Sequence, residues 1–234
     1  MKTVAPSAPL PGRFLVLEGI DGCGKTTQLE DLAVWLPTSG LMPAGARLLC
    51  TREPGGTPLG RALRELLLHP PERAAATTGA ELLLYAADRA QHVQELIRPA
   101  LAAGHWVLSD RFSGSTAAYQ GHGRGLPLAL IEQLEAIATG GLQADATLWL
   151  DLPLAVARRR RGHRAADRIE AAGEAFLARV AAGFAHLAAE RQWIRIDASA
   201  LPSAVSAACR QALQVAFGPR DPLPELLPGT RGDG

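Results

Sequence analysis

The feature that most constrains this chain is a glycine-rich turn near its start. Residues Gly19-Ile20-Asp21-Gly22-Cys23-Gly24-Lys25-Thr26-Thr27 fit the pattern GxxxxGK[ST]. The apolar run 14–18 before them predicts a strand, and 26–36 after them predicts a helix. In that setting successive backbone N–H groups point at a phosphate oxygen, and the helix N-terminus adds a favourable dipole. A chance match in a glycine-rich turn is the alternative, and the strand-loop-helix order argues against it.

The loop motif predicts functions for two side chains. Lys25 is expected to place a point charge at the β- and γ-phosphates, and the Thr26 hydroxyl is the expected Mg²⁺ ligand. Residues 19–27 together form the predicted ATP site, in which Cys23 is expected to be a small filler. The loop alone does not determine which reaction the bound nucleotide undergoes. Because the chain has no Asn and no Lys after Lys25, a guanine-reading NKxD motif is excluded.

Five apolar runs, at 14–18, 47–51, 106–110, 147–151 and 193–197, predict strands covered on both faces. Predicted helices alternate with them, at 26–36, 60–68, 80–103 with a kink or break at Pro99, 128–138 and 174–190. Alternating strands and helices imply an α/β fold with a parallel sheet, whose ligands lie beyond the carboxyl ends of the strands. We expect one domain at 13–217, with flexible ends at 1–12 and 218–234.

Composition narrows the function classes. The 24 basic and 23 acidic residues give a net charge of +1, which argues against a dedicated nucleic-acid partner. Three cysteines without a CxxC pair suit a reducing cytosol. With no signal-like start and no run of 18 apolar residues, we expect a cytoplasmic protein without a membrane partner. The basic residues divide into 22 Arg and two Lys, for which codon composition is the simplest explanation.

Three further clusters fall where an acceptor site is expected: 51–57 after the second strand, 85–91 in the long helix, and 110–121 after the third strand. Arg111 is a candidate clamp for an acceptor phosphate, and Asp110 for organising the Mg²⁺ hydration shell. Tyr85 and Arg89, one helical turn apart, could cover and hydrogen-bond a planar base. A structural ion pair and a core tyrosine are the alternatives if each cluster is taken singly.

In combination, the motifs EGIDGCGKTTQ, TREPGGTPLG, YAADRAQH and DRFSGSTAAYQG resemble those of the thymidylate kinase family. The resemblance covers the chain from about Arg13 to the last predicted strand. It implies a P-loop nucleoside monophosphate kinase fold, with a five-stranded parallel sheet flanked by helices and a small arginine-rich lid. It also implies transfer of the γ-phosphate of ATP to dTMP, with Mg²⁺, in a homodimer.

The resemblance also implies roles by matching position. Asp21 lies where the family has an acidic residue near the acceptor sugar. Arg89 lies where the family has an arginine that hydrogen-bonds the edge of the thymine base. The other implied dTMP-binding residues are Glu53 and Pro54 along the cleft, Arg64 and Arg111 at the phosphate, Tyr85 over the base, and Thr116 and Gln120 in the base pocket. Most relatives have Phe in place of Tyr85, so the added hydroxyl needs a partner.

The arginine-rich segment 157–170 follows the fourth strand. A basic run of this kind is commonly a nucleic-acid patch or a solvated helix face. Its position favours a lid, at about 157–171, that closes over the triphosphate. Because the phosphate loop has no basic residue between Gly19 and Gly24, the catalytic arginines should come from the lid, as in the bacterial type. Arg160, Arg161 and Arg164 are the candidates, and the spacing does not choose among them.

The resulting hypothesis is an ATP- and Mg²⁺-dependent dTMP kinase in which Lys25, Arg111 and the lid arginines are catalytic. Two alternatives stay open at this point. One is a kinase for another nucleoside monophosphate or a deoxynucleoside. The other is a P-loop ATPase or nucleotide-binding module without an acceptor, which would need no base pocket opposite the loop.

Overall fold

A computed structural model describes residues 12–71, 75–161 and 172–218, including only the backbone of Arg161. The predicted flexible ends therefore lie outside the described residues, except for Gly12 and Gly218, as do Arg164 and most of the predicted lid. No helix in the described part of the chain has the length and apolarity needed to cross a membrane.

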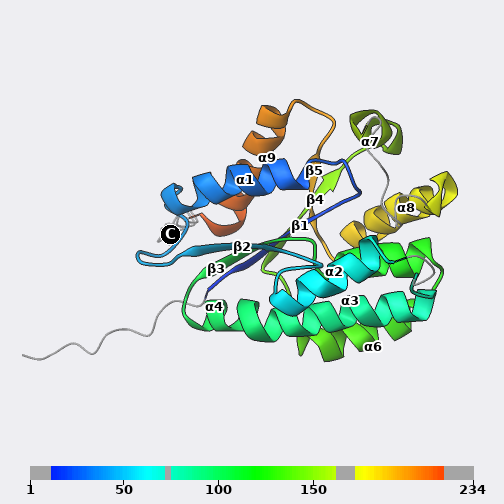
Figure 1. Cartoon of the computed structure of the whole chain (residues 1–234). Helices are drawn as coiled ribbons and strands as arrows, with labels where there is room; N and C mark the ends of the chain where they lie inside the picture. The colour runs from blue at the N-terminus through cyan, green and yellow to red at the C-terminus, as the bar shows by residue number, and fades with distance from the viewer. Residues whose placement is uncertain (1–11, 72–74, 162–171, 219–234) are drawn as a thin grey trace, which may run out of the picture.

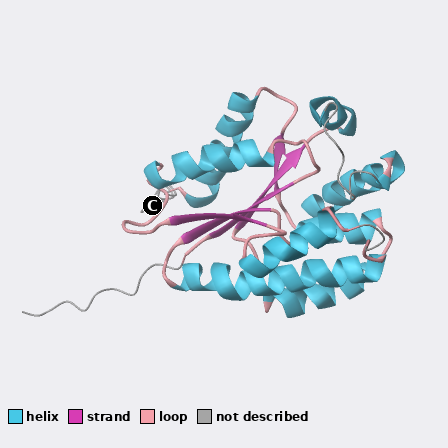
Figure 2. Cartoon of the chain, in the orientation of Figure 1, coloured by secondary structure: helices cyan, strands magenta, loops and turns pink. Residues whose placement is uncertain are grey.

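The sheet confirms the predicted strand content and direction. Its strands are β1 (Phe14–Glu18), β2 (Leu48–Arg52), β3 (Trp106–Asp110), β4 (Ala146–Asp151) and β5 (Ile194–Asp197). They lie in the order β2-β3-β1-β4-β5, and every neighbouring pair is parallel. Figure 2 shows this twisted sheet between two layers of helices. Strand β1 is central, and its neighbours β3 and β4 lie on opposite sides of it. Because the three strands are parallel, their carboxyl ends meet at the same edge of the sheet.

The helices cover both faces (Figure 1). They are α1 (Lys25–Trp35), α2 (Pro58–Leu68), α3 (Thr78–His92), α4 (Arg98–Ala102), α5 (Ser113–Thr116), α6 (Leu128–Thr139), α7 (Leu154–Arg161), α8 (Glu174–Glu190) and α9 (Pro202–Phe217), with π-helical turns at Val93–Ile97 and Ala117–Gly123. Helices α1 and α9 lie on one face of the sheet, and α3, α4 and α6 on the other. Helix α8 packs along the π-helical turn Ala117–Gly123.

Three helical details bear on the sequence-based expectation. Helix α9 was not predicted, although Val205, Cys209 and Leu213 recur every four residues and are buried in it. The predicted break at Pro99 is confirmed to within a few residues, because α3 ends at His92, a π-helical turn covers Val93–Ile97, and Pro99 lies in the first turn of α4, where its missing N–H is tolerated. The glycine-rich segment after β3, for which no secondary structure was predicted, is helical and buried.

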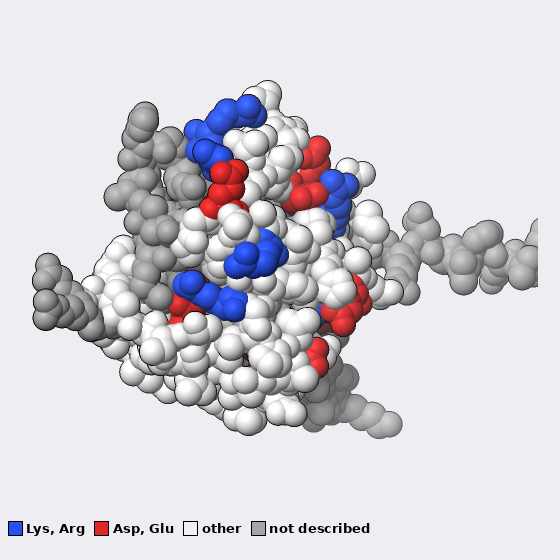
Figure 3. All heavy atoms as spheres, turned by 90° about the vertical axis from the view of Figure 1, so that its right-hand side faces the viewer, with Lys and Arg blue, Asp and Glu red and all other residues white. Residues whose placement is uncertain are grey.

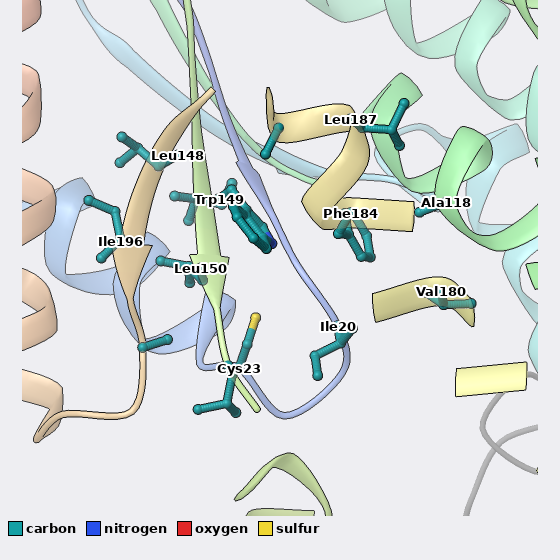
Figure 4. Packing of buried hydrophobic residues seen from close by; sticks show 14 of the residues in the cluster. Ile20, Cys23, Ala118, Leu148, Trp149, Leu150, Val180, Phe184, Leu187 and Ile196 are labelled. Atoms are coloured by element: carbon teal, nitrogen blue, oxygen red, sulfur yellow. The ribbon is translucent and has the colours of Figure 1, made fainter. Parts of the chain in front are cut away.

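The hydrophobic core reaches into the phosphate loop. Figure 4 shows Ile20 and Cys23 of the loop in one cluster with Trp149 and Leu150 of β4 and Phe184 of α8. Cys23 is 2% exposed, and burial raises the pKa of its thiol. Its sulfur therefore acts as an apolar filler that anchors the loop to the core.

On the face seen in Figure 3, the basic and acidic side chains of the described residues are scattered over a mostly uncharged surface. One exposed pair joins Arg158 of α7 to Glu174 of α8 at 2.9 Å. Exposed pairs of this kind contribute little to stability.

Candidate active site

The phosphate loop needs glycine at its first position. Gly19 has φ +143°, and a Cβ there would lie 2.7 Å from the carbonyl oxygen of Leu150 and 2.8 Å from the sulfur of Cys23. The loop ends at Gly24, the N-cap of α1, which has a left-handed φ of 99°. These two positions let the loop lie against β4 and then turn directly into the helix.

Two cations converge on one loop carbonyl. The ammonium of Lys25, a residue only 7% exposed, donates to the carbonyl oxygens of Gly19 and Ile20, each at 3.1 Å. The guanidinium of Arg111 donates to the same Gly19 oxygen at 3.0 Å. The cations from α1 and from the end of β3 are therefore already next to each other at the loop entrance.

Arg111 is held in an uncommon backbone conformation, with φ +73°. Its guanidinium binds Asp21 at 2.5 Å and the Ser115 hydroxyl at 2.9 Å. The Tyr119 hydroxyl donates to the other Asp21 oxygen at 2.7 Å. Burial raises the pKa of Asp21, but the cations of Arg111 and Lys25 outweigh it and hold that pKa well below its usual range. Asp21 is therefore a fixed anion at neutral pH.

Glu18, at the end of β1, organises the segment that follows β3. It is 1% exposed and accepts hydrogen bonds from the backbone N–H groups of Phe112 and Ser115, each at 3.0 Å, and from the Ser115 hydroxyl at 2.6 Å. Burial raises the pKa of this carboxyl, and Arg111 opposes the shift. Sequence reasoning missed Glu18, although a carboxylate that ends a buried apolar strand is itself a signal of a site.

A cavity of about 440 Å³ opens beside the loop. Its walls include Lys25, Thr26, Asp110 and Arg111. Asp110 has one buried carboxylate oxygen, Oδ1, for which the described residues supply no hydrogen-bond partner. Because a hydroxyl and a carboxylate are the oxygen ligands that Mg²⁺ prefers, Thr26 and Asp110 fit a magnesium ion bound there together with phosphates.

A second pocket adjoins this cavity, and all nine residues predicted to bind the acceptor line it. They are Asp21, Glu53, Pro54, Arg64, Tyr85, Arg89, Arg111, Thr116 and Gln120. Sequence reasoning missed four further lining residues: Leu68, Phe112, Ser115 and Tyr119. Tyr119 and Ser115 were within a motif that was singled out, but only the fold shows that their hydroxyls face Asp21 and Glu18.

A buried polar network fixes the floor of this second pocket. Arg89, 2% exposed, donates from Nε to Glu53 at 2.8 Å and from Nη2 to the Phe112 carbonyl at 3.1 Å, and it pairs with Glu135 through Nη1. The other oxygen of Glu53 lies 2.8 Å from Nδ1 of His92. Arg64 donates to the Pro54 carbonyl at 3.0 Å.

On the other side of the loop, a cavity of about 620 Å³ lies between α1 and the turn after β5. Gly24, Thr27 and Arg160 line it, together with residues 198–202. Arg160 donates weakly, at 3.4 Å, to the carbonyls of Ser199 and Ala200. Sequence reasoning missed the turn at 198–202, which its place after a parallel strand could have indicated.

Comparison with known proteins agrees with this geometry. Residues 17–208 match the family model described as Thymidylate kinase. The chain belongs to the thymidylate kinase family. The resemblance predicted from the four motifs is thus confirmed, as is the α/β fold predicted with it.

Several thymidylate kinases are similar over nearly their whole length. The thymidylate kinase of Synechococcus sp. (strain WH7803) is 70% identical over 205 residues, which cover 88% of this chain and 96% of that protein. That of Prochlorococcus marinus (strain MIT 9313) is 65% identical over 210 residues, 90% of this chain and 97% of that one. The crystal structure of thymidylate kinase from Ehrlichia chaffeensis matches with a TM-score of 0.70 at 31% identity, covering 88% of this chain and 100% of that one.

Proposed function

We propose that this chain transfers the γ-phosphate of ATP to dTMP and forms dTDP, a step in dTTP synthesis. The supporting observation is that the acceptor pocket and the phosphate-loop cavity share four side chains: Asp21, Glu53, Arg64 and Arg111. A nucleotide-binding module without an acceptor needs no such second pocket. Membership of the thymidylate kinase family favours dTMP over other acceptors.

The proposed mechanism is positioning and charge stabilisation. Lys25 binds the donor phosphates from within the loop, and Arg111 holds the acceptor phosphate on the other side of Gly19. Because both cations donate to the same carbonyl, the two phosphates they bind are brought within reach of each other for in-line transfer. Negative charge that spreads over the transferred group then lies between two fixed cations.

Mg²⁺ is part of this proposal. Thr26 and Asp110 would hold it, Asp110 through water, and the ion would neutralise charge on the β- and γ-phosphates. The unpartnered oxygen of Asp110 supports this assignment, since a buried carboxylate oxygen without a donor is costly unless a cation or water satisfies it.

We further propose that residues 13–217 act as one kinase domain and that about 157–171 form its lid. Arg160 supports the lid, because it lines both the loop cavity and the cavity beside α1. Among the described residues its guanidinium makes two long hydrogen bonds, both to backbone carbonyls, which it can exchange for a charged phosphate. Arg161 and Arg164 stay candidates for the same task.

Exposed apolar side chains on three neighbouring helices support the proposal of a homodimer. Leu59 and Leu66 of α2, Leu83 of α3, and Leu130 and Ile137 of α6 are between 44% and 79% exposed. The three helices pack side by side, with α3 in contact with both of the others. A second copy of the chain would cover this apolar surface. Sedimentation velocity tests this, since Ile137→Glu should shift a dimer toward the monomer.

A cytoplasmic location completes the proposal. Cys23, Cys50 and Cys209 are all unpaired thiols, as expected in a reducing compartment.

A coupled assay of ADP release, run with dTMP, dUMP, dCMP and thymidine as acceptors, tests the function. We expect dTMP to give the highest kcat/KM. Lys25→Ala should remove turnover, whereas Arg47→Ala, which deletes an exposed cation just before β2, should not. Preference for another acceptor, or ADP release that does not depend on any acceptor, would contradict the proposal.

A further inference from the structure

Glu135 lies on α6, outside every motif of the sequence, yet it contacts the guanidinium of Arg89 through Oε1. The other two partners of that guanidinium come from separate elements: Glu53 follows β2, and the Phe112 carbonyl follows β3. Arg89 thus donates three of its five side-chain N–H hydrogens to acceptors among the described residues. Because the three anchors approach from different directions, they fix the plane of the guanidinium and leave two donors in set positions.

Glu135 also forms part of a wall between two hollows. Arg89 lines the acceptor pocket, while Glu135 lines a separate groove of about 570 Å³ that Glu132 and Trp193 also line. The Glu135 side chain is 12% exposed. Its second oxygen, Oε2, is buried and has no hydrogen-bond partner in the described part of the chain. Arg89 is therefore the hydrogen-bond donor that the structure provides for Glu135.

Loss of Glu135 would act on Arg89 selectively. The Nε and Nη2 anchors would stay, whereas the Nη1 end of the fork would lose its charged partner. A buried cation that loses one of two carboxylates is free to move toward the remaining one, here Glu53. The donors that face the acceptor pocket would then shift, while the phosphate loop, which Glu135 does not touch, would keep its geometry.

We infer that Glu135 is a positioning residue for the acceptor nucleotide, which it acts on by fixing Arg89. The inference rests on the proposed function, in which Arg89 hydrogen-bonds the acceptor base. Glu135 itself touches neither substrate, so its effect should appear in the KM for dTMP rather than in kcat or in the KM for ATP.

The pH dependence offers a readout that a purely structural role would not give. Burial raises the pKa of Glu135 to about 7, against the opposing effect of Arg89; Glu53, Arg191 and Glu18 are the other charged groups that act on it. The ionised carboxylate holds a guanidinium more strongly than the protonated one. The KM for dTMP should therefore fall as pH rises through about 7, and this fall should vanish when residue 135 cannot ionise.

The test compares Glu135→Ala and Glu135→Gln with Glu132→Gln, a matched change at an exposed carboxylate one turn away on the same helix. We expect Glu135→Ala to raise the KM for dTMP about 5- to 20-fold, with kcat and the KM for ATP within about twofold of the parent. Glu135→Gln should raise the KM for dTMP less than Glu135→Ala does, and it should flatten the pH dependence of this KM between pH 6 and 8. Glu132→Gln should match the parent.

Several outcomes would overturn the inference. They are an unchanged KM for dTMP in both Glu135 variants, a loss confined to kcat, or a pH profile of Glu135→Gln that follows the parent. If Glu135→Ala does not fold, Glu135→Gln decides through its pH profile alone. A parent protein that releases no dTMP-dependent ADP would instead refute the proposed function, so the two failures are distinguishable.

Discussion

Replacing Gly114 by alanine should destabilise the protein and displace the segment that holds Arg111. A Cβ at this position would lie 2.8 Å from Cζ2 of Trp193 and 2.9 Å from Oε1 of Glu18, and closer still to Cη2 of the tryptophan. Ordinary carbon contacts need about 3.5–4.0 Å. The tryptophan ring is rigid, and the Glu18 carboxylate is fixed by Phe112 and Ser115, so neither neighbour can retreat cheaply.

The expected cost follows from these contacts. Overpacking a tight site by one methyl group typically costs about 1–3 kcal/mol. If the backbone moves instead, Glu18 loses one of the hydrogen bonds that it accepts, each worth about 1.5–3 kcal/mol when the acceptor is charged. We therefore expect about 2–3 kcal/mol. For a domain of this size, about 2–4 °C per kcal/mol corresponds to a Tm lower by about 4–12 °C.

Thermal and urea unfolding, followed by circular dichroism, would measure this loss in Gly114→Ala, in Trp193→Phe and in the double variant. Phenylalanine lacks the outer ring atoms that a new Cβ would meet, so the double variant should lose at least about 1 kcal/mol less than the sum of the single variants. Gly79→Ala is the control, because nothing lies within 4 Å of its added Cβ and alanine favours the helix. Additive losses, or a Gly114→Ala protein as stable as the parent, would refute the steric argument.

Three further predictions concern the site. Tyr119→Phe removes the hydroxyl that donates to Asp21 at 2.7 Å but keeps the ring, so steady-state kinetics should show a KM for dTMP about 3- to 10-fold higher and thermal unfolding a nearly unchanged Tm. Asp110→Asn should raise the Mg²⁺ concentration for half-maximal activity at least about tenfold, and an unchanged Mg²⁺ titration would argue against a metal role. Burial raises the pKa of Asp88 from its usual 3.8 to about 6, so its contribution to stability falls as pH rises between those values; urea unfolding at pH 4.5 and 7.5 should show the parent losing up to about 2 kcal/mol relative to Asp88→Asn.

The sequence predicted the sheet well because buried parallel strands are short and continuously apolar. All five strands were placed within about one residue of their observed ends. Helix α9 was missed because its small residues, such as Ala208 and Ala212, make the apolar stripe through Val205, Cys209 and Leu213 inconspicuous. The π-helical turn after α5 could not be predicted from its own glycines, since its stability comes from packing against α8.

Nine of the thirteen residues that line the acceptor pocket were predicted, because they lie in local motifs that resemble those of the family, whereas the contacts that hold them in place join distant parts of the chain. Glu53 and Arg89 lie 36 positions apart, and Arg89 and Glu135 lie 46 positions apart. No spacing rule joins Glu135, on a helix with exposed neighbours, to a motif on α3. Only the packing of α3 against α6 places the two side chains in contact.

In the proposed mechanism, the pair of cations at Gly19 would let the loop bind phosphate without large rearrangement. Lys25 and Arg111 both donate to the carbonyl oxygen of this residue, at 3.1 and 3.0 Å. A carbonyl is a neutral acceptor, and hydrogen bonds between ionised partners are roughly twice as strong. Phosphate oxygens can therefore replace the carbonyl as acceptor for both cations, which move little because α1 and the constrained backbone of Arg111 already fix their stems. In the proposed mechanism, the one lysine in the described part of the chain and the one non-glycine residue with positive φ beside the loop would thus hold two phosphates at opposite sides of a single backbone group.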